Sequence, residues 1–266
     1  MLLHGGPGAT HDYLSPLREL ASGGRAVVFY GQLGNGRSTH LPSRGADFWT
    51  VQLFVEELAN LLGHLGITDR YQVLGQSWGG FLAQEHALTQ PPGLLSLVLS
   101  NSAASYAAFS AEAVRLCAEL PAEVRATLDR HQTAGTTSDP GYTAACEVLN
   151  RRHLCRLDPW PQGVSDGLAQ IDVDPTVYHS MNGPSEFHVI GSAKEWPAED
   201  RLGEIGVPTL VLSGRFDEAT PSLQETLLKG IPGSRQAIFE ESSHMPFWEE
   251  PAAYTAVVSE WLRGHD

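Results

Sequence analysis

Short hydrophobic runs alternate with helical repeats along the first hundred residues of the chain. Uninterrupted apolar runs are typical of parallel strands that are covered on both faces, and apolar residues spaced three or four apart indicate helices with one buried face. The runs predict strands at 1–3, 26–30, 71–74 and 95–99. The spaced repeats predict helices at 14–21, 50–65 and 78–88.

The pattern changes near Ala103. From there to about Lys194 the apolar spacing is helical, most clearly at 112–119, 121–130 and 142–154, and no buried strand is evident. Alternation then resumes, with strands expected at 208–213 and 235–239 and helices at 222–230 and 251–263. Strands that alternate with helices predict a parallel sheet with right-handed connections. We therefore expect an α/β core formed by 1–103 and 195–266, with 104–194 inserted as a helical cap.

A glycine-flanked serine, Ser77, stands between the predicted strand at 71–74 and the helix that follows. Gly75 and Gly79 complete the G-x-S-x-G spacing of a nucleophile elbow. At such an elbow the turn is so tight that only small residues fit two positions before and after the serine. Chance alone produces about 0.2 matches to this motif in a chain with 27 glycines among 266 residues. The alternative is an ordinary strand-to-helix turn with a surface serine. Residues elsewhere in the chain that could act with Ser77 must therefore distinguish the two interpretations.

Two later loops supply the partners that a nucleophilic serine requires. Asp217 follows the predicted strand at 208–213, and His244 follows the one at 235–239. Ligand sites of open α/β sheets lie at these strand ends. A neutral histidine can take the serine proton, and a carboxylate can fix the tautomer of that histidine and stabilise its imidazolium form. The order Ser77, Asp217, His244 is that of the α/β-hydrolase triad.

The segment His4-Gly5-Gly6-Pro7-Gly8 forms a second candidate element of the site. A loop with this much backbone freedom can turn an N–H group toward a neighbouring oxyanion. A plain glycine–proline turn is the alternative.

The amino-acid composition and net charge indicate the general class of protein and exclude some kinds of partner. The chain is 42% hydrophobic and 18% charged, which is typical of a globular domain. A formal net charge of −14 argues against nucleic acid and anionic membranes as partners. No apolar run is long enough to cross a bilayer. Three cysteines without metal-ligand spacing indicate reduced thiols and a cytoplasmic location.

Four segments of the chain resemble one family. They are His4-Gly5-Gly6-Pro7-Gly8, Gly75-Gln76-Ser77-Trp78-Gly79-Gly80, the stretch M-N-G-P-S-E-F at 181–187, and G-R-F-D-E-A-T-P at 214–221. In these segments the chain resembles the proline iminopeptidase family of α/β-hydrolases, which includes tricorn-interacting aminopeptidases and amino-acid amidases. The stretch at 181–187 is the most specific of the four.

The resemblance implies an α/β-hydrolase fold, a mostly parallel sheet flanked by helices with an inserted helical cap. It also implies roles for seven residues and no metal or cofactor. The implied roles are Ser77 as nucleophile, Asp217 as orienting acid, His244 as base, the N–H groups of Gly6 and Trp78 as oxyanion hole, and Glu186 and Glu218 as ligands of the substrate α-amino group. Two carboxylates beside a covered site repel each other and are costly to desolvate, and an ammonium group relieves both costs. For each glutamate, a solvated surface charge is the alternative.

The chain departs from this family in two places. Members carry an N-terminal β-hairpin before the glycine-rich loop, and we expect it to be missing here. Members also tend to have aspartate where this chain has Gly31, between Tyr30 and Gln32. We expect both departures to affect activity and substrate range more than the fold.

The sequence thus predicts a serine hydrolase that cleaves N-terminal proline, or another small apolar residue, from short peptides or amino-acid amides. An amidase or esterase for small amine-bearing molecules is one alternative. A non-catalytic binding protein with the same fold is another. The sequence does not indicate the oligomeric state.

Overall fold

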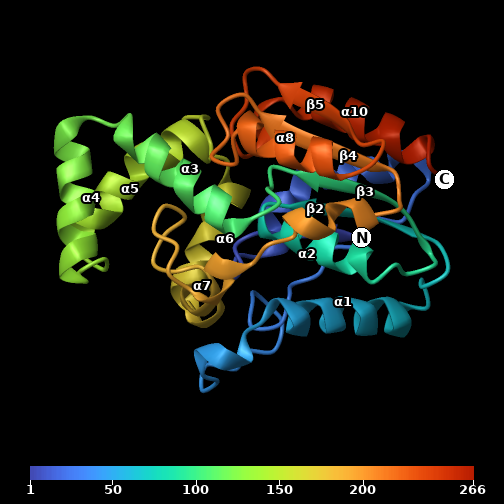
Figure 1. Ribbon diagram of the computed structural model, residues 1–266, viewed down its shortest axis with the longest axis horizontal. Helices are drawn as coiled ribbons and strands as arrows, with labels where there is room; N and C mark the ends of the chain where they lie inside the picture. The colour runs from blue at the N-terminus through green and yellow to red at the C-terminus, as the bar shows by residue number, and fades with distance from the viewer.

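A single parallel sheet organises the protein, and the computed structural model describes all of residues 1–266 (Figure 1). Its five strands lie in the spatial order in which they occur in the chain, and each pairs in parallel with the next. They are β1 (Leu2–Leu3), β2 (Tyr71–Gln76), β3 (Leu94–Ser100), β4 (Thr209–Gly214) and β5 (Arg235–Phe239). The predicted α/β architecture with a parallel sheet is confirmed.

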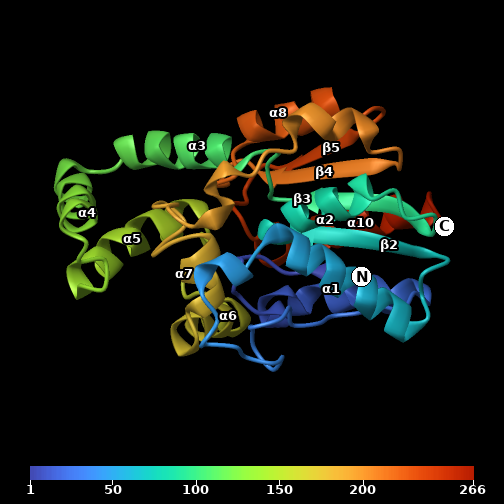
Figure 2. The same ribbon diagram turned by 60° about the horizontal axis from the view of Figure 1, so that its bottom comes forward.

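Helices cover both faces of this sheet (Figure 2). One face packs against α1 (Val51–Leu65), α2 (Trp78–Leu88) and α8 (Pro221–Gly230), and the other against the 3₁₀ helix η1 (His11–Gly23) and α10 (Pro251–Arg263). Successive strand side chains alternate between the two layers, because neighbouring residues of a strand point to opposite faces. Val73 thus lies in the first layer and Leu74 in the second. This double cover explains why the central strand β3 is an almost continuous, buried apolar run.

Local signals set the ends of the helix α1. The Thr50 side chain accepts the Leu53 N–H at 3.2 Å, which satisfies a donor that the first turn leaves free. Gly66 ends the helix with a φ of 66°, in the left-handed region that favours glycine. The predicted helix at 50–65 therefore matches α1 almost residue for residue.

The run at 26–30 corrects one sequence prediction. It forms no strand of the sheet: Phe29 makes a single isolated bridge to Leu2, whose N–H donates to the Val28 carbonyl at 3.0 Å. Residues 27–30 are only half-buried and Ala26 is exposed, so the run is not covered on both faces. The physical reason is its place beside β1, which is two residues long and offers few backbone partners.

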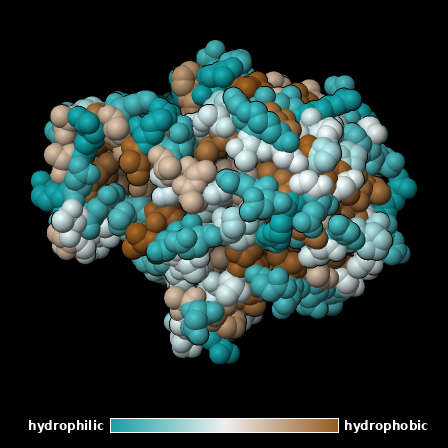
Figure 3. All heavy atoms as spheres, in the orientation of Figure 1, coloured by the Kyte–Doolittle hydropathy of each residue, from teal (hydrophilic) through white to brown (hydrophobic).

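The segment between β3 and β4 is helical, as predicted. It contains α3 (Tyr106–Ala118), α4 (Ala122–Ala134), α5 (Pro140–His153), α6 (Gln162–Val173) and α7 (Thr176–Met181). Helices α3, α4 and α5 project beyond one end of the sheet (Figure 1) and share a small hydrophobic core of their own. Figure 3 shows hydrophilic side chains interspersed with small hydrophobic groups over this face of the molecule, one of them near the junction of these helices with the rest.

The remaining elements are short. They are η2 (Ala46–Phe48), η3 (Ser192–Glu195), η4 (Glu199–Glu204) and α9 (Pro246–Glu249). The predicted helix at 14–21 is the 3₁₀ helix η1, which contains Pro16. None of the helices combines the length and apolar character that crossing a bilayer requires.

Candidate active site

The turn between β2 and α2 holds Ser77 in a strained conformation. Its φ of 55° and ψ of −124° lie where L-residues are rare. A Cβ on Gly75 would lie 2.0 Å from the Gly79 carbonyl oxygen, and one on Gly79 would lie 2.1 Å from that of Leu3. No side chain fits at either position, so the two glycines permit the tight turn that presents Ser77 at the end of the sheet.

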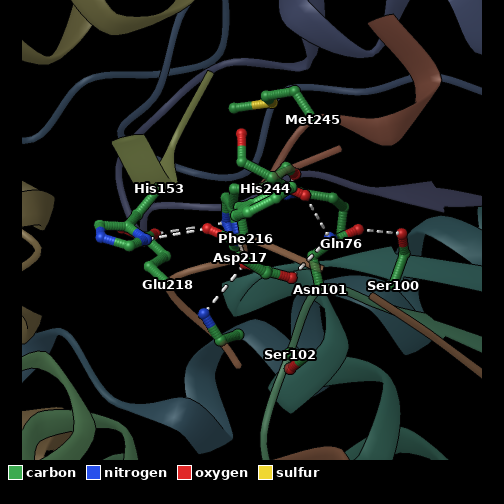
Figure 4. A network of polar contacts seen from close by, with 12 residues as sticks. Gln76, Ser100, Asn101, Ser102, His153, Phe216, Asp217, Glu218, His244 and Met245 are labelled. Atoms are coloured by element: carbon green, nitrogen blue, oxygen red, sulfur yellow. Dashed lines mark hydrogen bonds and ion pairs between the residues drawn. The ribbon is translucent and has the colours of Figure 1, made fainter. Parts of the chain in front are cut away.

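Asp217 and His244 meet in the interior, although 27 residues separate them in the chain (Figure 4). They come from the loops after β4 and β5, and both are almost completely buried. The Nδ1 atom of His244 donates to Asp217 Oδ1 at 2.6 Å. Because that nitrogen carries the proton in the neutral ring, Nε2 is left as the atom that can accept one.

One small cavity of about 30 Å³ brings most of the predicted site residues together. Its lining includes Gly6, Ser77, Glu186, Glu218 and His244. The Nε2 atom of His244 lies 3.5 Å from Glu218 Oε1 and is not bonded to the Ser77 hydroxyl. Asp217 lies behind His244, outside this cavity.

The glycine-rich loop lies directly against the nucleophile. A Cβ on Gly5 would lie 2.9 Å from Ser77 Cβ, and Gly6 has a φ of 118°, which favours glycine. Trp78 is the first residue of α2, and the first N–H groups of a helix have no partner within it. The Trp78 N–H therefore has no partner within α2, and Gly6 lines the cavity together with Ser77, so both N–H groups remain candidates for an oxyanion hole.

A buried phenol connects this loop to the rest of the site. The Gly5 N–H donates to the Tyr13 hydroxyl at 2.6 Å, and that hydroxyl donates to Gln76 Oε1. The Gln76 amide in turn donates to the His244 carbonyl at 3.2 Å. Tyr13 thus joins the glycine-rich loop, the elbow and the histidine loop.

Gln32 forms a second connection. Its backbone N–H donates to His4 Nε2 and its side-chain amide to the His4 carbonyl, each at 3.0 Å. Its Oε1 accepts the Trp78 indole N–H at 2.9 Å. Gly31 is not among the residues lining the cavity, and the segment around it is connected to the site through the Gln32 hydrogen bonds to His4 and Trp78.

The two glutamates have unusual environments. Glu218 is 1% exposed, and neither of its side-chain oxygens has a hydrogen-bond partner. Burial raises the pKa of Glu218 to about 8, with Glu186 and Asp217 adding to the rise and His244 opposing it. Burial also raises the pKa of Glu186, which accepts a hydrogen bond from the Tyr178 hydroxyl at 2.8 Å. A cation placed between the two carboxylates would satisfy both.

His244 responds to the same carboxylates. Burial by itself lowers the pKa of His244, but Asp217, Glu218 and Glu186 outweigh burial and raise it to about 9. In the free protein at neutral pH the ring is therefore mostly protonated. A positive charge bound at Glu218 and Glu186 would favour the neutral ring.

A larger hollow of about 440 Å³ adjoins the cavity beside α5, α6 and α7. The two spaces share Leu154, Leu168, Ile171 and Glu186. The His153 carbonyl, at the end of α5, accepts the backbone N–H groups of Glu218 and His244 at 3.3 and 3.2 Å. The inserted helices are thus bonded to both loops that carry the acidic and imidazole groups.

Sequence reasoning missed several buried polar residues of this region. They are Tyr13, Gln32, Asn101 and the hydrogen-bonding role of Gln76. The available signal was a polar residue at the end of an apolar run, as at Gln76 and Asn101. No three His, Cys, Asp or Glu side chains converge where they could hold a metal ion.

The chain is similar to known proteins over nearly its whole length. A family model described as alpha/beta hydrolase fold matches residues 1–251. Proline iminopeptidase of Saccharolobus solfataricus is 39% identical over 98% of this chain and 83% of the relative, and that of Heyndrickxia coagulans is 37% identical over 98% and 89%. The crystal structure of proline iminopeptidase from Mycobacterium smegmatis aligns with a TM-score of 0.92 and 49% identity, covering 99% of this chain and 88% of that one. The crystal structure of a protein called VinJ aligns with a TM-score of 0.98 and 49% identity, covering 100% and 90%.

Proposed function

Because the chain belongs to the proline iminopeptidase family of α/β hydrolases, we propose that it is a serine hydrolase that releases N-terminal proline from short peptides. Other small apolar residues and amino-acid amides fall within the proposed range. One observation carries the proposal: Ser77 and His244 line the same cavity as the half-buried Glu186 and the buried Glu218, whose side-chain oxygens have no hydrogen-bond partner. A nucleophile beside a site for a cation suits a substrate with a free amine next to its scissile bond.

In the proposed reaction Ser77 attacks the carbonyl carbon of the first residue, and Nε2 of His244 takes the serine proton. The resulting imidazolium then donates that proton to the leaving amine. Asp217 holds the ring through Nδ1 and stabilises its positive charge. Water, activated by the same histidine, hydrolyses the acyl-enzyme and restores Ser77. The N–H groups of Gly6 and Trp78 stabilise the oxyanion of each tetrahedral intermediate.

Glu186 and Glu218 bind the ammonium group of the substrate in this proposal. Both carboxyl groups have raised pKa values because burial penalises their charge. An ammonium between them offsets that cost and lets both ionise. The ammonium also offsets the negative charges that raise the pKa of His244, which favours the neutral base when an amine-bearing substrate is bound. A substrate with a blocked amine gains neither effect.

We also propose that residues 104–194 act as a cap over the core formed by 1–103 and 195–266. Support comes from the hollow of about 440 Å³ beside α5, α6 and α7, which shares four lining residues with the reaction cavity and could receive the part of a substrate beyond the scissile bond. The cap contributes Glu186, so it participates in substrate selection as well as in covering the site. A cytoplasmic location is part of the proposal, supported by three free cysteines.

A panel of aminoacyl-arylamides tests the function. The proline and alanine compounds should be hydrolysed with their amine free and much more slowly when the same amine is acetylated. A fluorophosphonate probe should label Ser77 in parallel. Equal rates on free and acetylated compounds would indicate a general amidase or esterase. Absence of both labelling and turnover would indicate a binding protein.

A further inference from the structure

Asn101 lies behind the acidic residue of the site, directly after β3 (Figure 4). Its side chain is fully buried, and its φ is 54°, in the left-handed region. Asparagine tolerates this region better than most residues, but glycine would occupy it without strain. Such conformations persist where surrounding contacts hold them.

The side chain of Asn101 uses both ends of its amide. Nδ2 donates to Asp217 Oδ2 at 2.6 Å and to the Ser243 carbonyl at 3.3 Å. Oδ1 accepts the Ser100 hydroxyl at 2.6 Å, and Ser100 accepts the Tyr254 hydroxyl at 2.9 Å. A carboxylate and a carbonyl can only accept, so the orientation of the amide is determined by its partners. A directed chain therefore runs from Tyr254 on α10, through the sheet, to Asp217.

The two oxygens of Asp217 have separate tasks. Oδ1 bonds His244 Nδ1 at 2.6 Å and accepts the Ala219 N–H at 2.9 Å, while Oδ2 bonds Asn101. The donor on Oδ2 prevents the carboxylate from rotating away from the imidazole. The bond to the Ser243 carbonyl holds the backbone immediately before His244. Asn101 thus contacts both loops whose relative position determines the Asp217–His244 geometry.

Pairing within the sheet does not need this side chain. The backbone N–H of Asn101 donates to the Leu212 carbonyl at 2.7 Å, and the Ser100 carbonyl accepts the Ser77 N–H at 2.9 Å. Those bonds would survive replacement of the amide. The side chain is therefore free to serve the site.

We propose that Asn101 is a positioning residue for the hydrolysis, which holds Asp217 and the His244 loop in register through its amide. The inference rests on the proposed function only in that Ser77, Asp217 and His244 carry out the reaction. Asn101 does not contact the reacting atoms. It acts through Asp217 by aiming Oδ1 at the imidazole and by solvating the carboxylate when the imidazolium forms.

Substitutions at Asn101 distinguish the role of its side-chain amide from that of its backbone conformation. Asn101→Gly removes the amide and suits a φ of 54°. It should lower kcat for a free-amine substrate roughly 10- to 100-fold, the factor for losing one hydrogen bond to a charged group, with KM almost unchanged. Asn101→Asp keeps the shape but replaces the donor with a second carboxyl group beside Asp217. Tyr254→Phe breaks only the far end of the chain and should have a smaller effect in the same direction.

The pH dependence of inactivation by a fluorophosphonate supplies a readout that a merely structural role would leave unchanged. The charged groups facing His244 are Asp217, Glu218 and Glu186, and none is altered. Asn101→Gly loosens the Asp217 contact and should move the rise in inactivation rate to lower pH. Asn101→Asp adds negative charge and should move it to higher pH.

The outcomes separate this inference from the proposed function. A wild-type protein that neither hydrolyses free-amine substrates nor reacts with the probe would overturn the function itself. An active wild type with unchanged kcat and pH dependence in folded Asn101→Gly would overturn only the role of Asn101. If circular dichroism shows that Asn101→Gly does not fold, the pH dependence of inactivation of Asn101→Asp becomes the test of the role of Asn101. An unchanged pH dependence in that variant would overturn the role.

Discussion

Asp217 and Glu218 are neighbours in the sequence, and each is 1% exposed, yet their carboxyl groups have opposite surroundings. Asp217 receives hydrogen bonds from His244, Asn101 and the Ala219 N–H. The side-chain oxygens of Glu218 receive none. A buried carboxylate with all its donors in place is fixed and ready to act on its neighbour. A buried carboxylate that accepts no hydrogen bonds carries an unfavourable desolvation free energy until a ligand supplies donors.

The same contrast holds for two groups of residues around Ser77. In the first group, here called the rear, Tyr13, Gln76 and Asn101 form a hydrogen-bonded network that joins the strand ends, and Tyr13 and Gln76 also line the cavity. In the second group, here called the front, Glu186 and Glu218 share that cavity with His244. We infer that the rear is preorganised by folding and that the front becomes complete only when a cation binds. The following experiments test that division, beginning with the largest expected effect.

Replacement of the nucleophile tests whether the rear is organised around Ser77. Ser77→Ala should lower kcat by on the order of 10⁵- to 10⁶-fold, leaving only binding and the oxyanion hole. It should also abolish probe labelling, while the melting temperature stays near that of the wild type because no buried contact is lost. Ser234→Ala, in a distant turn, is the matched control. Activity close to wild type in Ser77→Ala would refute the assignment.

Neutralising the front carboxylates tests amine recognition. Glu186→Gln should weaken kcat/KM on free-amine substrates by about 2–5 kcal/mol, the scale for removing one partner of a buried charge pair. Acetylated substrates have no charge to pair, so their low rates should change little or improve. Glu218→Gln should behave in the same way.

Glu241→Gln, at an exposed glutamate in the loop after β5, controls for the loss of charge alone. Equal losses on free and acetylated substrates would mean that Glu186 only holds the cap in place. The proposed aminopeptidase specificity would then be wrong.

The pH dependence tests whether the front carboxylates control His244. The pKa of His244 is raised to about 9, so the ring is charged and inactive as a base below that pH and becomes neutral above it. Inactivation of the free enzyme by an uncharged fluorophosphonate should therefore rise with pH toward 9. The rise in kcat for a free-amine substrate should occur at lower pH, because the bound ammonium offsets the carboxylates.

Glu218→Gln removes one of the charges that raise the pKa of His244. It should move the rise in inactivation rate to lower pH. If the wild-type inactivation rate instead rises near the ordinary histidine pKa of about 6.5, the carboxylates do not control the base.

The smallest effect is expected at the rear. Tyr13→Phe leaves the buried Gly5 N–H without its acceptor and should lower the free energy of unfolding by about 1–3 kcal/mol and reduce kcat modestly. Tyr30→Phe is a matched control, because the buried Tyr30 hydroxyl has no hydrogen-bond partner to lose. Equal melting temperatures for the two variants would show that the Tyr13 connection contributes nothing to the rear network.

Local patterns in the sequence were sufficient for much of the fold. The helix at 50–65 and the elbow at Ser77 depend on residues close together in the chain, such as a Thr50 cap and glycines two positions from the serine. The run at 26–30 shows the limit. Its apolar composition predicted a covered strand, but burial depends on which segments pack beside it, and that is not a local property.

The candidate site divides in the same way. The sequence by itself determined which chemical groups stand at the ends of the strands, and parallel strands bring those ends to one edge. Family resemblance, rather than spacing, pointed to Glu186, which lies 32 residues before Glu218. Only the tertiary structure decided that the Asp217 carboxylate accepts several hydrogen bonds while the Glu218 carboxylate accepts none. It also decided that Asn101 supplies one of the donors to Asp217. Desolvation and hydrogen bonding arise from atoms brought together by folding, so two carboxyl groups acquire different roles only when the chain has folded.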